Sequence, residues 1–204
     1  MRGASDFDRI TSNIVVWHGY DSAVKAELYP TYVITPSVSY FIEPIPLRSE
    51  ALNKLVGSGC VAGIIVTNCN HYRESASFAP EFSAPVFGHG EVFPHKPPRE
   101  SSIINGDKIC GGLTVIGIEA AAEGEIALHY APDGGTLMVG DALINFGPYG
   151  FTFLPRKYCA NEKQMRRSLQ KLLDYKAERI LFAHGIPILG DAGERLQVLL
   201  NNGL

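Results

Sequence analysis

The sequence predicts an α+β fold in which two β-sheets pack face to face and helices cover their outer sides. Both halves of the chain contain short segments rich in β-branched and aromatic residues, and both halves end in segments with helical periodicity. Hydrophobic residues make up 46% of the 204 positions, which is ample for a buried core. No linker-like stretch and no internal repeat divides the sequence, so we expect residues 1–204 to form one domain.

In the first half, we expect strands that lead into a helix and then into one deeply buried strand. The expected strands, rich in β-branched and aromatic residues, are 13–20, 25–28, 32–35 and 39–42. Pro30 and Pro36 interrupt them, as in an antiparallel meander. Apolar residues at helical spacing predict a helix over 47–56, which Gly57 ends. The uninterrupted apolar run 61–66 predicts a strand that is buried on both faces.

The middle of the chain is expected to be less regular. We expect a short helix over 74–82, a short strand over 85–87 and a loop over 89–102, because the last segment is polar and rich in proline.

The second half repeats the order of strands followed by helices. The expected strands are 113–119, 125–131, 137–139 and 179–182. The segment Ala131–Gly135 contains the residues of a hairpin turn between two of them. Asn161 is a suitable N-cap for an amphipathic helix over 162–176, and Asp191 is one for a last helix over 192–201.

Composition excludes several classes of partner. A formal charge of −3 gives no electrostatic reason to expect a nucleic acid or an anionic membrane surface. The longest apolar runs are far too short to span a bilayer, and the first ten residues lack the apolar stretch of a signal peptide. The four cysteines form no CxxC pair, which favours reduced thiols in a cytoplasmic protein. The oligomeric state stays open, and a homo-oligomer is compatible with the sequence.

Polar segments that follow expected strands carry the motifs. The buried strand runs into Thr67–Arg73 (TNCNHYR), the hairpin is followed by Val139–Leu143 (VGDAL), and the strand over 179–182 leads into Ala183–Gly185 (AHG). In order and in type of element, they resemble the metal-binding segments of the metallo-β-lactamase superfamily: HxHxDH, the segment of the bridging aspartate, and GHG. The resemblance covers about Asn13 to Leu204. It implies a four-layer αββα sandwich of two mixed sheets flanked by helices.

The same resemblance implies a depleted set of metal ligands. The family holds one or two metal ions, commonly zinc, and a water activated by the metal attacks a carbonyl or phosphoryl group. Of the ligand positions, only Asp141 and His184 carry the family's residue types. The positions of the missing histidines and aspartate fall on Asn68, Asn70, Tyr72, Arg73 and the neighbourhood of Ala121. A classical dinuclear zinc site is therefore not expected.

From this comparison we derive two groups of candidate site residues. The catalytic candidates are Asp141, His184 and His71. The pocket candidates are Asn68, Asn70, Tyr72, Arg73 and Glu119. We expect the Arg73 guanidinium to offset the Asp141 carboxylate, a task that a metal ion would otherwise perform.

Each candidate also has a purely structural interpretation. Asn68 and Asn70 are also typical of a turn, and His71 of an ordinary surface histidine. Asp141 is compatible with a turn cap or with an ion pair to Arg73. Glutamates near the expected strand ends, Glu125 among them, are interpreted as solvated charges.

Two functions follow from these candidates. The first is a hydrolase-like scaffold that has lost most zinc ligands and binds a small molecule in the inherited cleft without catalysis, and for it no cofactor is expected. The alternative is a metal-dependent hydrolase with a rearranged mononuclear site, in which His71, Asp141 and His184 hold one zinc or another divalent metal. Its substrate would be an ester, a thioester or a phosphoester. A third interpretation is a structural subunit with a vestigial cleft.

Overall fold

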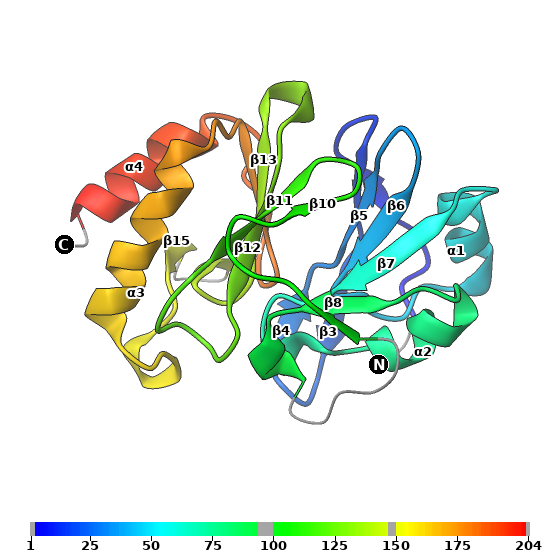
Figure 1. Cartoon of the computed structure of the whole chain (residues 1–204), viewed down its shortest axis with the longest axis horizontal. Helices are drawn as coiled ribbons and strands as arrows, with labels where there is room; N and C mark the ends of the chain where they lie inside the picture. Colours follow the sequence, from blue (N-terminus) through cyan, green and yellow to red (C-terminus); the bar gives the residue numbers. More distant parts are fainter. Residues whose placement is uncertain (1–2, 94–99, 147–149, 203–204) are drawn as a thin grey trace.

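The computed structural model describes residues 3–93, 100–146 and 150–202, and these form four layers (Figure 1). Helices α1 (Ser49–Val56) and α2 (Ser75–Glu81) cover one sheet, and α3 (Glu162–Leu169) and α4 (Ala192–Asn202) cover the other. The expected α+β sandwich of αββα type is confirmed.

The first sheet has seven strands and is mixed. Its order in space is β1 (Asp8–Arg9), β2 (Ile14–Val16), β5 (Thr31–Ile34), β6 (Ser39–Ile42), β7 (Val61–Ile65), β8 (Val86–Gly88) and β9 (Glu100–Ser102). Neighbours from β1 to β6 are antiparallel, as in the expected meander, and those from β6 to β9 are parallel.

The second sheet has five strands, and two further hairpins form separate two-stranded sheets. The order of the sheet is β10 (Lys108–Ile109), β11 (Leu113–Gly117), β12 (Ile126–Tyr130), β13 (Thr136–Val139) and β16 (Arg179–Phe182). Only the pairing of β13 with β16 is parallel. The separate hairpins are β3 (Gly19–Asp21) with β4 (Ala26–Leu28), and β14 (Leu143–Phe146) with β15 (Gly150–Phe153).

Short 3-10 helices complete the described chain. They are η1 (Cys69–His71), η2 (Gly90–Val92), η3 (Pro132–Gly134), η5 (Arg156–Tyr158) and η6 (Gln170–Asp174). The Asn161 side chain accepts a hydrogen bond from the backbone of Gln164, so the predicted N-cap of α3 is confirmed. The helix expected over 162–176 is regular only to Leu169 and continues as η6.

Alternating side chains of the strands build three hydrophobic clusters. In β7, Ile64 packs toward α1 and α2 while Ile65 packs toward the second sheet, and both are fully buried. This alternation follows from the two-residue repeat of a strand, and it confirms the strand expected to be buried on both faces. The second sheet contributes Leu128 to the cluster between the sheets and Leu137 to the cluster under α3 and α4.

Two expectations need correction. The strand expected over 13–20 is two strands, β2 and β3, because β2 pairs with β5 in the first sheet while β3 pairs with β4 in a separate hairpin; the buried Trp17 between them donates to the carbonyl of Ile45. The loop expected over 89–102 contains strand β9, which pairs with β8; its residues 94–99 lie outside the described residues. Edge pairing of this kind depends on backbone hydrogen bonds, which the side-chain pattern of β9 does not reveal. Among the described residues, no helix is both long and apolar enough to cross a bilayer.

Four strand ends meet at one edge of the sandwich. Strands β6 and β7 run parallel in the first sheet, and β13 and β16 run parallel in the second. The residues just beyond their carboxyl ends are polar, and contacts across the two sheets join them. The fold therefore brings together four segments that are far apart in the sequence.

Candidate metal centre

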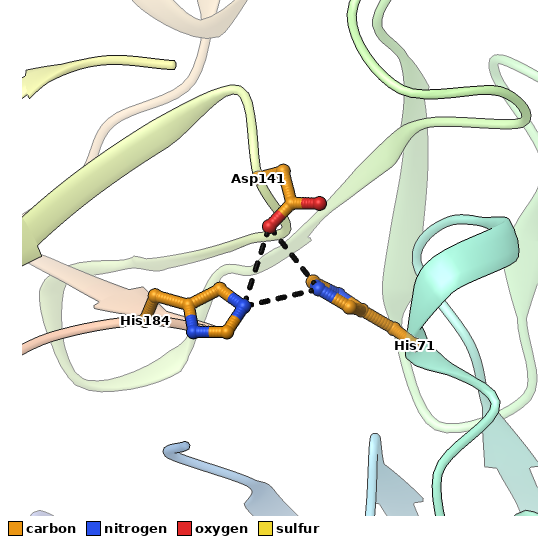
Figure 2. A group of neighbouring side chains, drawn as sticks. All are labelled: His71, Asp141 and His184. Atoms are coloured by element: carbon orange, nitrogen blue, oxygen red, sulfur yellow. Dashed lines mark hydrogen bonds and ion pairs between the residues drawn. The ribbon is translucent and has the colours of Figure 1, made fainter. Parts of the chain in front are cut away.

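Three side chains converge where these strands end (Figure 2). His71 comes from η1 after β7, Asp141 follows β13, and His184 follows β16. The Asp141 Oδ1 atom lies 3.1 Å from His71 Nε2 and 3.4 Å from His184 Nε2, and the two nitrogens are 3.3 Å apart. One donor atom from each residue thus points at a common centre.

The spacing of these donors fits a zinc ion. Zinc–ligand bonds of about 2.0–2.1 Å in tetrahedral geometry place neighbouring donors roughly 3.3 Å apart. An octahedral ion of the magnesium type at a similar bond length would place them roughly 2.9 Å apart. The observed 3.3 and 3.4 Å match the tetrahedral value, and the observed 3.1 Å lies midway between the two values. Two imidazoles and one carboxylate are also a common donor set for zinc.

Glu43 fixes the orientation of His71 by contacting Nδ1, the ring nitrogen that does not face Asp141 and His184. Its Oε1 atom lies 2.8 Å from His71 Nδ1, and the Thr67 hydroxyl donates to the same carboxylate oxygen. A hydrogen bond at Nδ1 leaves Nε2 as the nitrogen that faces Asp141 and His184. This carboxylate–histidine arrangement is the usual outer support of a metal-binding imidazole.

Arg73 forms its ion pair with Glu43, and its charge also helps to lower the pKa of Asp141, in the direction expected from the sequence. Its guanidinium lies 3.2 Å from Glu43 Oε2, and it donates to the backbone carbonyls of Glu43 and Ala183. Arg73 therefore connects the first sheet to the residue before His184. Both Glu43 and Arg73 have positive φ angles (51° and 44°), a strained conformation that persists only where surrounding contacts impose it.

Asn68 is fully buried and takes part in the centre as a hydrogen-bonding group. Its Nδ2 atom donates to Glu125 Oε2 at 2.7 Å and to Asp141 Oδ2 at 3.3 Å, and its Oδ1 accepts from the backbone of Asn70. The interpretation of Asn68 as a turn residue is therefore incomplete, since its amide also contacts two carboxylates.

The remaining pocket candidates, Asn70, Tyr72 and Glu119, have other surroundings than the three donors. Asn70 is exposed, and Tyr72 is half-buried and packs against the cluster under α1 and α2. Glu119 has a side chain that is 60% exposed and forms an ion pair with Lys171 of η6, while its backbone donates to Ser168 of α3. We therefore place Glu119 outside the metal centre, because a side chain held on the helical layer does not share the strand ends.

Two buried carboxylates were missed by the sequence reasoning. Glu43 was not considered, and Glu125 was interpreted as a solvated charge, although it is only 4% exposed. The available signal was that each glutamate adjoins a run of apolar strand residues, namely β6 or β12. A charged side chain is rarely buried unless it has partners, so its environment had to come from the tertiary structure.

Gly140 makes room for this arrangement behind Asp141. A Cβ atom at Gly140 would lie 2.5 Å from Thr67 Oγ1 and 2.7 Å from Glu125 Oε1. Such distances are well below ordinary contact, so only glycine lets the two polar side chains approach the backbone here.

Burial and neighbouring charges shift the pKa values of the three donors. Burial lowers the pKa of His71, but the Glu43 carboxylate, aided by Asp141, outweighs burial and raises it to about 9. Burial and then the His71 cation lower the pKa of His184 to about 4. Burial raises the pKa of Asp141, but the His71 cation outweighs burial and holds it well below its usual range. At neutral pH, His184 is therefore neutral and Asp141 is ionised, whereas His71 holds a proton.

The two supporting carboxylates differ in their protonation. Burial raises the pKa of Glu43, but His71 and Arg73 together outweigh burial and lower it, so Glu43 is ionised. Burial and the neighbouring Asp141 charge raise the pKa of Glu125 to about 8. Glu43 is therefore the charged support of the centre, and Glu125 is largely neutral at pH 7.

Two of the three donor side chains are partly exposed to solvent. The side chains of Asp141 and His184 are 14% and 16% exposed, against 4% for His71. A separate cavity of about 330 Å³ lies between η6 and α4 and is lined by none of the three donors. The site is therefore defined by the three convergent donors and not by this cavity.

Comparison with known protein families agrees with the αββα fold described above. The family model described as the metallo-beta-lactamase superfamily matches residues 9–202. This chain belongs to the metallo-β-lactamase superfamily. No curated protein matches the sequence at a significant level.

Solved structures share the fold at low sequence identity. The DIM-1 metallo-β-lactamase has a TM-score of 0.74 and 15% identity, covering 98% of this chain and 99% of that chain. A metallo-β-lactamase family protein from Thermus thermophilus has a TM-score of 0.70 and 18% identity, covering 95% and 80%. An archaeal superfamily protein from Sulfolobus tokodaii has a TM-score of 0.71 and 11% identity, covering 94% and 86%. At these identities, the likeness establishes the fold alone.

Proposed function

We propose that this chain is a metal-dependent hydrolase that holds one zinc ion through His71, Asp141 and His184 and cleaves an ester, a thioester or a phosphoester. The observation that carries the proposal is the convergence of three donor atoms within 3.1–3.4 Å of one another. Membership of the superfamily supports hydrolysis as the reaction class.

Each residue of the centre then has a defined task. His71, Asp141 and His184 supply the donors, and Glu43 keeps His71 Nε2 turned inward. Arg73 balances the Glu43 charge and holds the carbonyl that precedes His184. A zinc ion held by these donors would supply Lewis acidity to activate water and polarise the substrate. The exposed sides of Asp141 and His184 are where substrate would approach.

Metal analysis tests this proposal directly. After treatment with a chelator and titration with zinc, the protein should bind one zinc per chain with a defined affinity. A panel of nitrophenyl esters, thioesters and phosphodiesters should contain at least one that is hydrolysed by the zinc form and not by the chelated form. Absence of stoichiometric zinc uptake would refute the proposal.

Zinc affinity should depend strongly on pH. The raised pKa of His71, about 9, means that zinc must displace a proton at neutral pH. Asp141, with its lowered pKa, and His184, with a pKa of about 4, are already deprotonated there. We therefore expect the affinity to rise about tenfold per pH unit between pH 7 and 8.5, because one proton leaves per zinc bound.

Competition with a chromophoric chelator measures this slope. Calorimetry in two buffers of different ionisation enthalpy counts the released protons independently. An affinity that is flat over this pH range would show that His71 either carries no proton or is not a ligand.

A second function, non-catalytic binding of a small molecule in the inherited cleft, has one observation in its favour. The cations of His71 and Arg73 balance the carboxylates of Glu43 and Asp141, so the buried charges compensate one another within the protein. If zinc fails to bind in the titration above, this charge-balanced cluster is the better account of the residues.

A further inference from the structure

Glu125 is a buried carboxyl group that reaches Asp141 by two routes. One route passes through the Asn68 amide to the Asp141 carboxylate. The other is a hydrogen bond to the backbone of Ala142, the next residue. We propose that Glu125 is a positioning residue that clamps Asp141 through Asn68 and the Ala142 backbone, so that Oδ1 faces His71 and His184.

The side-chain route has a fixed direction. Asn68 Nδ2 donates to Glu125 Oε2 at 2.7 Å and to Asp141 Oδ2 at 3.3 Å. Asn68 Oδ1 accepts from the backbone N–H of Asn70 at 2.9 Å, so a flipped amide would lose the hydrogen bonds to Asn70 and to the ionised Asp141. With Oδ2 engaged in this way, Oδ1 is the oxygen left to face the imidazoles.

The backbone route holds the segment that carries Asp141. Glu125 Oε1 accepts from the Ala142 N–H at 2.9 Å. On the other side of Asp141, Gly140 lets the same oxygen approach to a distance that any Cβ would block. Glu125 therefore restrains both the main chain and the side chain of the aspartate.

The chemistry of the clamp requires a group that accepts on both sides. Both oxygens of a carboxyl group can accept, because a protonated oxygen keeps a lone pair, whereas a glutamine offers one accepting oxygen and one NH₂ that only donates. In Glu125→Gln, the NH₂ group must face one of the two donors. Because the site is buried, water cannot easily replace the lost partner, and the clamp should open on one side.

This inference deepens the proposed function, and its test has a readout that needs no metal. Crystal structures of chelator-treated wild type, Glu125→Gln and Asn68→Ala should show Asp141 Oδ1 at its 3.1 Å contact with His71 only in the wild type. With Co²⁺ as the probe, both variants should bind about 10–100-fold more weakly, the usual effect of losing an outer-shell partner. The visible absorption of bound Co²⁺ should also weaken, because a freely turning carboxylate no longer holds tetrahedral geometry.

Glu91→Gln is the matched control. Glu91 is exposed and accepts from the backbone of Gly124, so it holds the segment next to Glu125 without reaching Asp141. This control should leave the position of Asp141 and the Co²⁺ spectrum unchanged.

The outcomes separate the two proposals. The clamp is overturned if Asp141 keeps its wild-type position in Glu125→Gln and Asn68→Ala and if both variants bind Co²⁺ as the wild type does. If the wild type binds no Co²⁺, the proposed function fails. The position of Asp141 in the crystal structures of the wild type and the variants still shows whether Glu125 positions Asp141. Should Glu125→Gln fail to fold, Asn68→Ala, which removes only the side-chain route, decides it.

Discussion

Replacing His184 with alanine should weaken zinc binding by more than about 100-fold and abolish hydrolysis. Loss of an outer-shell partner alone costs about 10–100-fold in affinity, and His184 is one of the three donors that converge among the described residues. The two donors that remain, on His71 and Asp141, cannot hold zinc in a tetrahedral site. Chelator competition measures the affinity, and turnover of the best substrate from the ester panel measures the activity.

His129→Ala is the control for this variant. His129 lies on β12 of the same sheet, and its Nε2 atom contacts the carbonyl of Lys176, far along the strand from the metal centre. The His129→Ala protein should keep the wild-type zinc affinity. A His184→Ala protein that binds zinc as the wild type does would remove this residue from the ligand set.

Glu43→Gln should lower the free energy of unfolding by about 3–5 kcal/mol, the typical cost of removing one partner from a buried ion pair. The substitution leaves the Arg73 guanidinium and the His71 ring without the carboxylate that both contact in the interior. His71 should lose its proton more easily as a result, because Glu43 is the main group that raises its pKa. Urea denaturation, monitored by circular dichroism, measures the change.

Two further variants identify the cause of this loss. Glu162→Gln breaks another glutamate–arginine pair, with Arg166 on the surface of α3, and should cost no more than about 0.5 kcal/mol. Adding Arg73→Met to Glu43→Gln should recover part of the stability, since it removes one of the uncompensated charges. If Glu43→Gln and Glu162→Gln lower the free energy of unfolding equally, Glu43 is not a charged group in the protein interior.

Elements with strong local patterns could be predicted from the sequence, whereas short strands with weak patterns could not. Apolar runs and helical spacing predicted the strands β6 and β16, the helices α1 and α4 and the double-sided burial of β7, because these features depend on local periodicity. Strands β9, β10, β14 and β15 were not predicted, because short strands with weak patterns form by pairing with neighbours.

By itself, the sequence determined the two-sheet architecture and three candidate donors, His71, Asp141 and His184. These residues follow strands with strong apolar patterns, so their position at strand ends could be predicted from the sequence. Only the tertiary structure decided that the donors meet, that Arg73 pairs with Glu43, and that Glu125 and Asn68 lie behind Asp141. Those contacts join residues up to 113 positions apart, and an ion pair between distant segments leaves no periodic trace in the chain.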